Sequence, residues 1–89
     1  MTDTEISEII AKDDLSEARS AIARALAVNP DDDGAYYCLG RVLWKFDRRP
    51  EALSAFTAAV RLNPDSPARH ALEMGRDVFD FFNPDLLNP

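Results

Sequence analysis

A short motif recurs in this 89-residue sequence at a spacing of 34 residues. Asn29-Pro30-Asp31 returns as Asn63-Pro64-Asp65. The same spacing relates small or apolar residues that precede each motif: Ala18 with Ala52, Ile22 with Phe56, Ala25 with Ala59, Ile6 with Gly40, and Ile9 with Leu43. A fixed period of about 20–50 residues is typical of chains built from stacked supersecondary units. This recurrence constrains the fold more strongly than composition does.

The apolar residues before the second motif have the period of a helix. One stripe follows the spacing i, i+3, i+4, i+7 and consists of Tyr36, Leu39, Gly40 and Leu43. A second stripe consists of Ala52, Phe56, Ala59 and Val60. A glycine inside a helix costs about 1 kcal/mol relative to alanine, so Gly40 is expected to allow a close approach between helices. The pattern predicts two antiparallel helices with facing stripes.

These positions resemble the tetratricopeptide repeat, a helix–turn–helix unit of about 34 residues. The residues that stand as the family has them are Leu39, Gly40, Ala52, Phe56, Ala59 and Pro64. Tyr36 replaces the usual tryptophan, and Leu43 replaces the usual tyrosine. Asp47 stands where the family commonly has glycine, and aspartate tolerates a left-handed backbone better than most residues. The resemblance implies an all-α antiparallel solenoid of about five helices; an ordinary helical hairpin is the alternative.

The resemblance also divides the single domain, residues 1–89, into four parts. These are a clipped first repeat at 1–32, a full repeat at 33–66, a capping helix at 67–82 and a tail at 83–89. Thr2 occupies the tryptophan-like position of the clipped repeat, so its first helical turn is expected to fray. Asp14 is expected to cap the second helix in a capping box with Glu17, and Pro50 to open the fourth.

The last helix departs from the repeat pattern. It carries an apolar face of its own, formed by Ala68, Ala71, Leu72, Gly75, Val78, Phe79 and Phe82. This face is expected to cover the apolar end of the preceding repeat. The tail with Leu86-Leu87 is expected to be extended or frayed.

Composition excludes several classes of function. The net charge of −6, without a basic stripe, argues against nucleic acid. The sequence has neither a long apolar run nor a basic leader, so we expect no membrane contact and a cytoplasmic location.

Cys38 is the only cysteine and His70 the only histidine, and no catalytic motif accompanies them. We therefore expect no enzyme, cofactor or metal. The acidic run Asp31–Asp33 is interpreted as solvated helix N-terminal charge, with a cation site as the alternative.

The resemblance implies a protein-interaction scaffold whose opening helices line a concave groove. On the third helix, the residues offset from the interhelical stripe are Tyr37, Cys38, Arg41, Trp44 and Lys45. Aromatic residues and arginine dominate binding hot spots, so Tyr37, Arg41, Trp44 and Lys45 are predicted to contact a partner. Arg69 and Arg76 would extend the positive charge and favour an acidic peptide or a free carboxylate. Alternatively, Trp44 packs against the fifth helix, Arg41 and Lys45 are solvated, and Cys38 is a semi-buried, unreactive thiol.

Two further partner hypotheses follow from the resemblance and the C-terminus. The family's clamp for chaperone C-termini needs Lys, Asn and Arg, whereas the corresponding residues here are Asp3, Ser7, Cys38, Ala68 and Leu72. A chaperone-tail receptor is therefore not expected. The second hypothesis is self-association through Phe79–Phe82 or the Leu86-Leu87 tail. The chain is accordingly expected to be a monomer or a weak homodimer.

Overall fold

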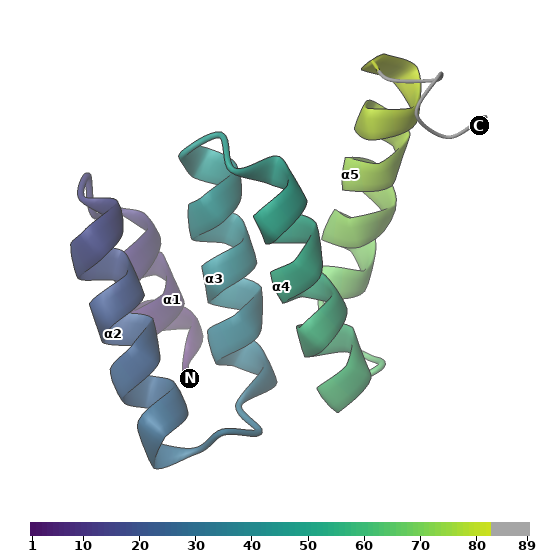
Figure 1. Cartoon of the computed structure of the whole chain (residues 1–89). Helices are drawn as coiled ribbons and strands as arrows, with labels where there is room; N and C mark the ends of the chain where they lie inside the picture. The colour runs from purple at the N-terminus through teal and green to yellow at the C-terminus, as the bar shows by residue number, and fades with distance from the viewer. Residues whose placement is uncertain (83–89) are drawn as a thin grey trace.

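The computed structural model describes residues 1–82, with side chains described as far as Gly75. This part of the chain forms α1 (Asp3–Ile10), α2 (Leu15–Val28), α3 (Asp33–Lys45), α4 (Arg49–Leu62) and α5 (Ala68–Phe82). Consecutive helices run antiparallel and pack side by side (Figure 1). The predicted all-α antiparallel fold of five helices is confirmed.

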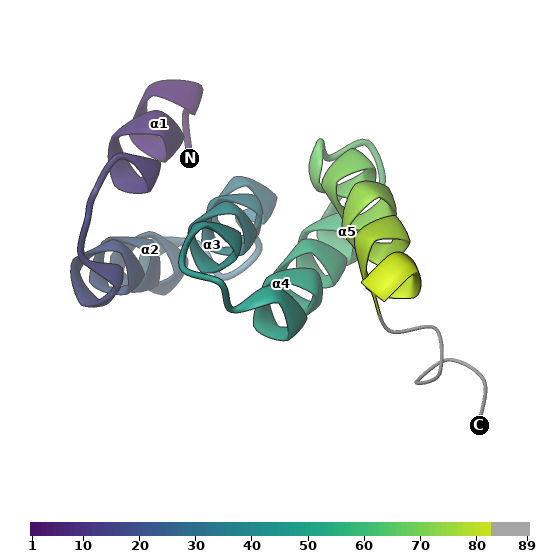
Figure 2. The ribbon, with the colours of Figure 1, turned by 90° about the horizontal axis from the view of Figure 1, so that it is seen from above.

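The helices alternate between two sides of the molecule. Seen from above, α1, α3 and α5 line one side, and α2 and α4 line the other (Figure 2). We call these sides the α1/α3/α5 face and the α2/α4 face. The residues that point toward each face decide where a partner can bind.

Two clusters of buried side chains form the core, and α3 contributes to both. The first joins α1, α2 and α3 through Ile6, Ile9, Ala18, Ile22, Ala35, Cys38 and Val42. The second joins α3, α4 and α5 through Leu43, Ala52, Ala55, Phe56, Ala59, Ala68 and Leu72. Two pairs of residues 34 positions apart are buried to the same extent: Ala18 and Ala52 are both 0% exposed, and Ile22 and Phe56 are both 2% exposed. The sequence repeat is thus also a repeat in the core.

The recurring Asn-Pro-Asp motif makes the same turn twice. The Asn29 Oδ1 atom accepts a hydrogen bond from the Asp31 amide at 3.1 Å, and the Asn63 Oδ1 atom accepts one from the Asp65 amide at 3.0 Å. Both asparagines follow the last residue of a helix and have extended backbones. Asparagine favours such turns because its side chain can replace a backbone acceptor. The motif therefore ends one helix and redirects the chain into the next.

The turn between α3 and α4 contains the left-handed residue that the sequence predicts. Asp47 has a φ of 66°, the only positive φ at a non-glycine residue in the described chain. Aspartate can therefore replace the glycine that the family commonly has here. Pro50 follows within the first turn of α4, where no intrahelical amide donor is needed.

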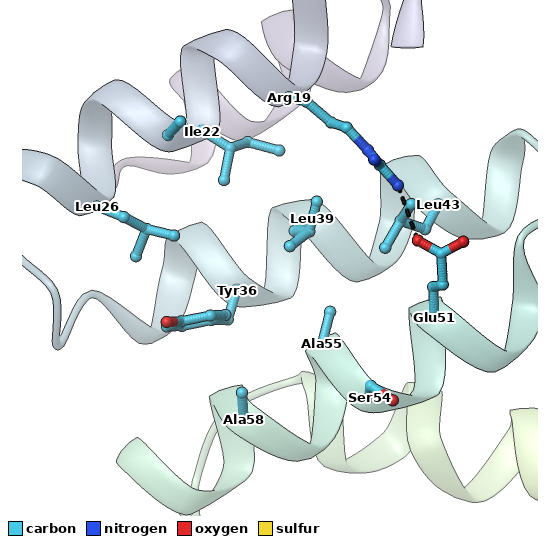
Figure 3. Close-up of a pocket in the computed structure, with 11 residues that line it drawn as sticks. Arg19, Ile22, Leu26, Tyr36, Leu39, Leu43, Glu51, Ser54, Ala55 and Ala58 are labelled. Carbon is cyan, nitrogen blue, oxygen red and sulfur yellow. Dashed lines mark hydrogen bonds and ion pairs between the residues drawn. The ribbon is translucent and has the colours of Figure 1, made fainter. Parts of the chain in front are cut away.

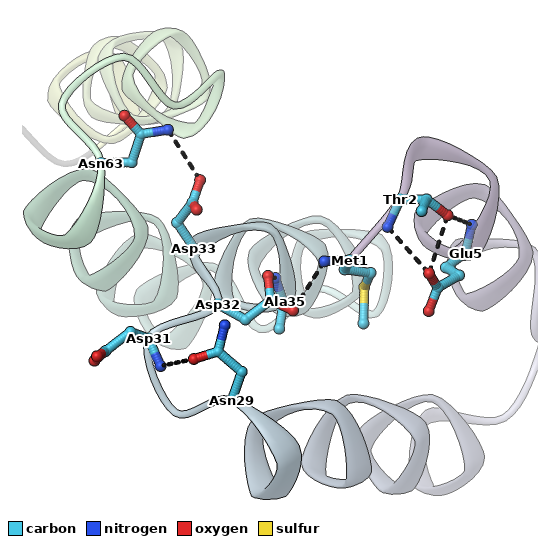
Figure 4. Close-up of polar contacts among 9 residues, drawn as sticks. All are labelled: Met1, Thr2, Glu5, Asn29, Asp31, Asp32, Asp33, Ala35 and Asn63. Atoms are coloured by element: carbon cyan, nitrogen blue, oxygen red, sulfur yellow. Dashed lines mark hydrogen bonds and ion pairs between the residues drawn. The ribbon is translucent and has the colours of Figure 1, made fainter.

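The first turn of α1 is capped, so the expectation that it frays is wrong. The Thr2 hydroxyl accepts a hydrogen bond from the Glu5 amide at 3.2 Å, and the Glu5 carboxylate accepts one from the Thr2 amide at 3.2 Å (Figure 4). This reciprocal pair is a capping box. At α2, by contrast, Asp14 alone caps the helix, by accepting from the Ser16 and Glu17 amides. Thr2-x-x-Glu5 was the sequence signal for the first cap.

The acidic run before α3 is more than solvated charge. The Asp32 carboxylate accepts a hydrogen bond from the Ala35 amide at 3.2 Å and pairs with the Met1 ammonium at 2.9 Å. Asp33 accepts a hydrogen bond from the Asn63 side-chain amide at 3.2 Å (Figure 4). Asp32 thus caps α3 and ties it to the start of α1, and Asp33 joins α3 to the end of α4. Only Asp31 is fully exposed.

We expect Asp32→Ala to lower the free energy of unfolding by about 1–2 kcal/mol, because α3 loses its N-cap and the Met1 ammonium loses its partner. Asp31→Ala is the matched control: it removes the neighbouring carboxylate, and we expect a change within about 0.5 kcal/mol. Urea denaturation of both variants measures the difference. Equal losses of unfolding free energy in the two variants would show that removing a negative charge, and not removing the N-cap, explains the effect.

Candidate functional site

A hollow of about 330 Å³ opens between α3 and α5 on the α1/α3/α5 face. We call it the Trp44 hollow; it is lined by Arg41, Trp44, Phe56, Ala71, Met74 and Gly75. Phe56 is 2% exposed and forms the floor, whereas Met74 is 57% exposed at the rim. The lining is apolar apart from Arg41. A hollow of this size suits a bulky side chain of a partner rather than a whole folded surface.

Trp44 serves both the α5 contact and the hollow. Its ring is half-buried and packs with the second core cluster. A Cβ atom placed on Gly75 would lie 3.2 Å from the Cζ3 atom of Trp44, so the ring lies directly against the α5 backbone. The Arg49 guanidinium lies over the ring at 5.0 Å from its centroid. The structure thus supports the prediction that Trp44 packs against the fifth helix, and it also exposes one side of the ring to the hollow.

Arg41 is exposed and held in one orientation by its own helix. Its Nη1 atom donates a hydrogen bond to the Tyr37 hydroxyl at 3.0 Å, and its guanidinium lies 5.7 Å from the centre of the Tyr37 ring. Tyr37 in turn contacts Phe56, with ring centroids 6.1 Å apart. Among the side chains described, none forms an ion pair with Arg41. Its positive charge is therefore available to a ligand at the hollow.

Lys45 and Cys38 interact with α1 instead of facing the Trp44 hollow. The Lys45 Nζ atom donates to the carbonyl oxygens of Ile10 at 2.7 Å and Lys12 at 3.0 Å. The Ile10 carbonyl belongs to the last turn of α1, where carbonyls lack intrahelical partners, and the Lys12 carbonyl follows just beyond it, so Lys45 caps the end of that helix. Cys38 is 0% exposed, and its thiol donates to the Ile6 carbonyl at 3.9 Å. The expectation that Cys38 is only semi-buried is therefore corrected.

Arg69 does not extend the positive charge of the hollow, contrary to the sequence-based prediction. Its Nε atom lies 3.9 Å from the Glu73 carboxylate, and both side chains line a separate depression with Pro64, Asp65, Ser66 and His70. The α5 residues at the Trp44 hollow are instead Ala71, Met74 and Gly75. The side chains of Arg76, Val78, Phe79 and Phe82 and the Leu86-Leu87 tail lie outside the described residues.

A larger hollow, of about 550 Å³, lies on the α2/α4 face and was not predicted (Figure 3). Its floor is the α3 stripe Tyr36, Leu39 and Leu43, which was assigned only to helix contacts. Small residues on the flanking helices, among them Ala23, Ala55 and Ala58, leave this stripe partly uncovered. Arg19 and Glu51 pair across the hollow at 2.8 Å. The small residues on facing sides of α2 and α4 were the sequence feature from which this hollow could have been predicted.

Burial raises the pKa of the Cys38 thiol from 9.0 to about 11. The folded protein then holds this proton more tightly than the unfolded chain. The Cys38 contribution to the free energy of unfolding is therefore complete below pH 9 and is lost as the pH rises toward 11. We expect urea denaturation between these pH values to show a steeper loss for the wild type than for Cys38→Ala, by on the order of 2 kcal/mol. Parallel pH profiles would contradict this assignment.

The described residues give no sign of a metal site or a membrane span. No group of three or more His, Cys, Asp or Glu side chains among them is arranged to hold a metal ion. In the same part of the chain, every helix is too short or too polar to cross a membrane.

Comparison with known proteins adds one match. The family model described as "Tetratricopeptide repeat" matches residues 10–67. The match runs from the last residue of α1 to the residue before α5 and includes both Asn-Pro-Asp turns. No curated protein and no solved structure matches the chain.

Proposed function

Because the chain belongs to the tetratricopeptide repeat family, whose repeats are typically non-catalytic modules that mediate protein–protein interactions, we propose that it binds a partner segment at the Trp44 hollow. We also propose the division of the domain into a clipped repeat (1–32), a full repeat (33–66) and a capping helix (67–82). In this division the hollow lies at the junction of the full repeat and the cap.

The observation that carries the proposal is an apolar hollow beside a guanidinium that has no ion-pair partner among the side chains described as far as Gly75. Trp44 and Met74 supply an aromatic and a flexible apolar wall, and Arg41 supplies directed hydrogen-bond donors. Aromatic residues and arginine dominate the energetics of binding, and methionine adapts to partners of different shapes. A partner that inserts a bulky apolar side chain and places a carboxylate on Arg41 would use all three residues.

The α2/α4 hollow is larger but lacks this combination. Its charged residues, Arg19 and Glu51, already pair with each other at 2.8 Å. A carboxylate or ammonium from a partner would have to break that pair before it could bind. The Trp44 hollow presents Arg41 without that competition among the described side chains.

Of the four residues predicted to bind a partner, two already line the Trp44 hollow. Arg41 and Trp44 line it directly, and Tyr37 contributes by holding Arg41. We propose Lys45 as a cap of α1 instead, because its ammonium is bonded to the Ile10 and Lys12 carbonyls. The proposed partner-binding set is therefore Tyr37, Arg41, Trp44 and Met74.

Selection from a random peptide library tests the proposal. Peptides selected on the wild type are assayed by fluorescence polarisation against Arg41→Glu and against Arg24→Glu, an exposed arginine of α2 that lines neither hollow. We expect Arg41→Glu to weaken binding at least about tenfold and Arg24→Glu to change it little. Equal effects of the two charge reversals would overturn the proposal.

A second pair of variants tests the apolar wall. Met74→Ala removes the exposed side chain at the rim, and Val28→Ala removes one that is 88% exposed elsewhere. Neither change is expected to alter stability by more than about 0.5 kcal/mol, because both side chains are exposed. Only Met74→Ala should weaken peptide binding. Trp44→Ala is a poorer test because the ring also packs against α5.

A further inference from the structure

The α1/α3/α5 face carries a continuous stripe of α3 residues whose two ends differ in charge. Gly34, Tyr37, Arg41 and Trp44 follow one another at spacings of three, four and three residues, so they share one side of α3. A second hollow, of about 210 Å³, opens at the start of this stripe. We call it the Asp33 hollow; it is lined by Met1, Asp3, Ile6, Asp32, Asp33, Gly34, Tyr37, Ser66 and Pro67. The Tyr37–Arg41 hydrogen bond joins it to the Trp44 hollow.

The Asp33 hollow retains negative charge after its internal contacts are made. Asp32 is neutralised by the Met1 ammonium at 2.9 Å. Within the described part of the chain, the Asp33 carboxylate accepts a side-chain hydrogen bond from one neutral group, the amide of Asn63, at 3.2 Å. Asp3 is exposed, and no described side chain forms an ion pair with it or with Asp33. Two carboxylates therefore face a ligand at this end of the stripe.

The opposite end is positive and apolar. Arg41 provides the charge, and Trp44 and Met74 provide the apolar walls. A wholly acidic segment would be repelled by Asp3 and Asp33 and by the net charge of −6. A wholly basic segment would be repelled by Arg41. Charge complementarity along the stripe therefore requires a segment with both signs in a fixed order.

We infer that this face binds an extended peptide segment that places a basic residue at the Asp33 hollow, an acidic residue on Arg41 and a bulky apolar residue in the Trp44 hollow, in that order. The inference rests on the proposed function and adds the orientation of the partner. Asp33 and Arg41 are eight positions apart on one helix, which is about 12 Å at 1.5 Å per residue. An extended segment covers this distance in about four residues. The shortest matching sequence is therefore basic-x-x-x-acidic-apolar or its reverse.

Two synthetic peptides of identical composition test the order. One reads Lys-Ser-Ser-Ser-Asp-Leu-Phe between neutral caps, the other exchanges its Lys and Asp, and each is also made in the reverse chain direction. Amide ¹H–¹⁵N spectra are recorded during titration to millimolar peptide. In the chain direction that binds, we expect the wild type to prefer the peptide whose Asp adjoins the Leu-Phe pair over its exchanged partner by about tenfold, with shifts at both hollows. The protein variant Asp3→Lys with Arg41→Glu should prefer the exchanged peptide.

The outcomes separate the orientation from the function. Equal binding of both peptides at the Trp44 hollow would overturn the orientation and leave the proposed function intact. If neither peptide binds, this inference is overturned. The library-selected peptides then test the proposed function independently. Single variants Asp3→Asn and Arg41→Glu replace the double variant if its spectrum loses dispersion. For each single variant, a loss of the wild-type preference supports the inference, and an unchanged preference contradicts it.

Discussion

Gly40→Leu is expected to unfold the protein or to lower its free energy of unfolding by at least about 3 kcal/mol. A Cβ atom at Gly40 would lie 2.4 Å from both the Cδ1 and Cε1 atoms of Phe56, far inside van der Waals contact. Phe56 is 2% exposed, so moving its ring aside would disturb the second core cluster. A chain of 89 residues has a total stability of roughly 4–13 kcal/mol, so this loss is a large part of it. Thermal and urea denaturation followed by circular dichroism measure it.

Gly75→Ala is the matched control for Gly40→Ala, since both replace a buried helical glycine. At Gly75 the nearest atom to the new Cβ would be the Leu53 Cδ2 atom at 2.7 Å, which is the tip of a flexible side chain. The better helix propensity of alanine, worth about 1 kcal/mol, offsets a small displacement there. We expect Gly75→Ala to stay within about 1 kcal/mol of the wild type and Gly40→Ala to be clearly less stable. An unchanged melting temperature for Gly40→Leu would contradict the α3–α4 contact.

Phe56→Ala is expected to cost about 3–5 kcal/mol, the second large effect. The ring fills the space between α3, α4 and α5, contacts Tyr37 and closes the floor of the Trp44 hollow. Its removal leaves a cavity that Gly40 on the facing helix cannot fill. Leu62→Ala on the same helix is the control, because Leu62 is 40% exposed and loses less buried surface than Phe56, which is 2% exposed. Comparable losses in the two variants, measured by urea denaturation, would refute the central position of Phe56.

The two sites should also be coupled. If the clash at Gly40 is with the Phe56 ring, Gly40→Ala should cost little in a Phe56→Ala background. The coupling free energy of this double-mutant cycle is expected to be about 1–3 kcal/mol. Additive costs would mean that Gly40 is required for another reason.

The sequence predicted those features that depend on local chemistry or on the repeat. The 34-residue spacing identified equivalent buried positions, such as Ile22 and Phe56, because stacked units bury the same side of each helix. Asp47 was predicted to be left-handed, and its φ of 66° confirms this. Both features follow from residue type and position alone.

Features that depend on contacts between distant segments were missed or misplaced. Lys45 was predicted to face a partner, but its ammonium reaches the end of α1, more than thirty residues away in sequence. Asp32 was interpreted as solvated, but it pairs with the Met1 ammonium. Arg69 was placed with the groove because its helix was known but the rotation of that helix about its axis was not. The α2/α4 hollow was missed because small residues predict close contact as readily as an open space.

The most direct test of the central claim is an amide ¹H–¹⁵N spectrum of the protein titrated with the tightest peptide from the library selection. The proposed function predicts that the largest shifts fall on Tyr37, Arg41, Ala71, Gly75 and the indole of Trp44. Residues of the α2/α4 hollow, such as Ala23 and Ala58, should remain in place and serve as the internal reference. Shifts concentrated at Ala23, Ser54 and Ala58, with the Trp44 indole unmoved, would contradict the claim and assign binding to the opposite face.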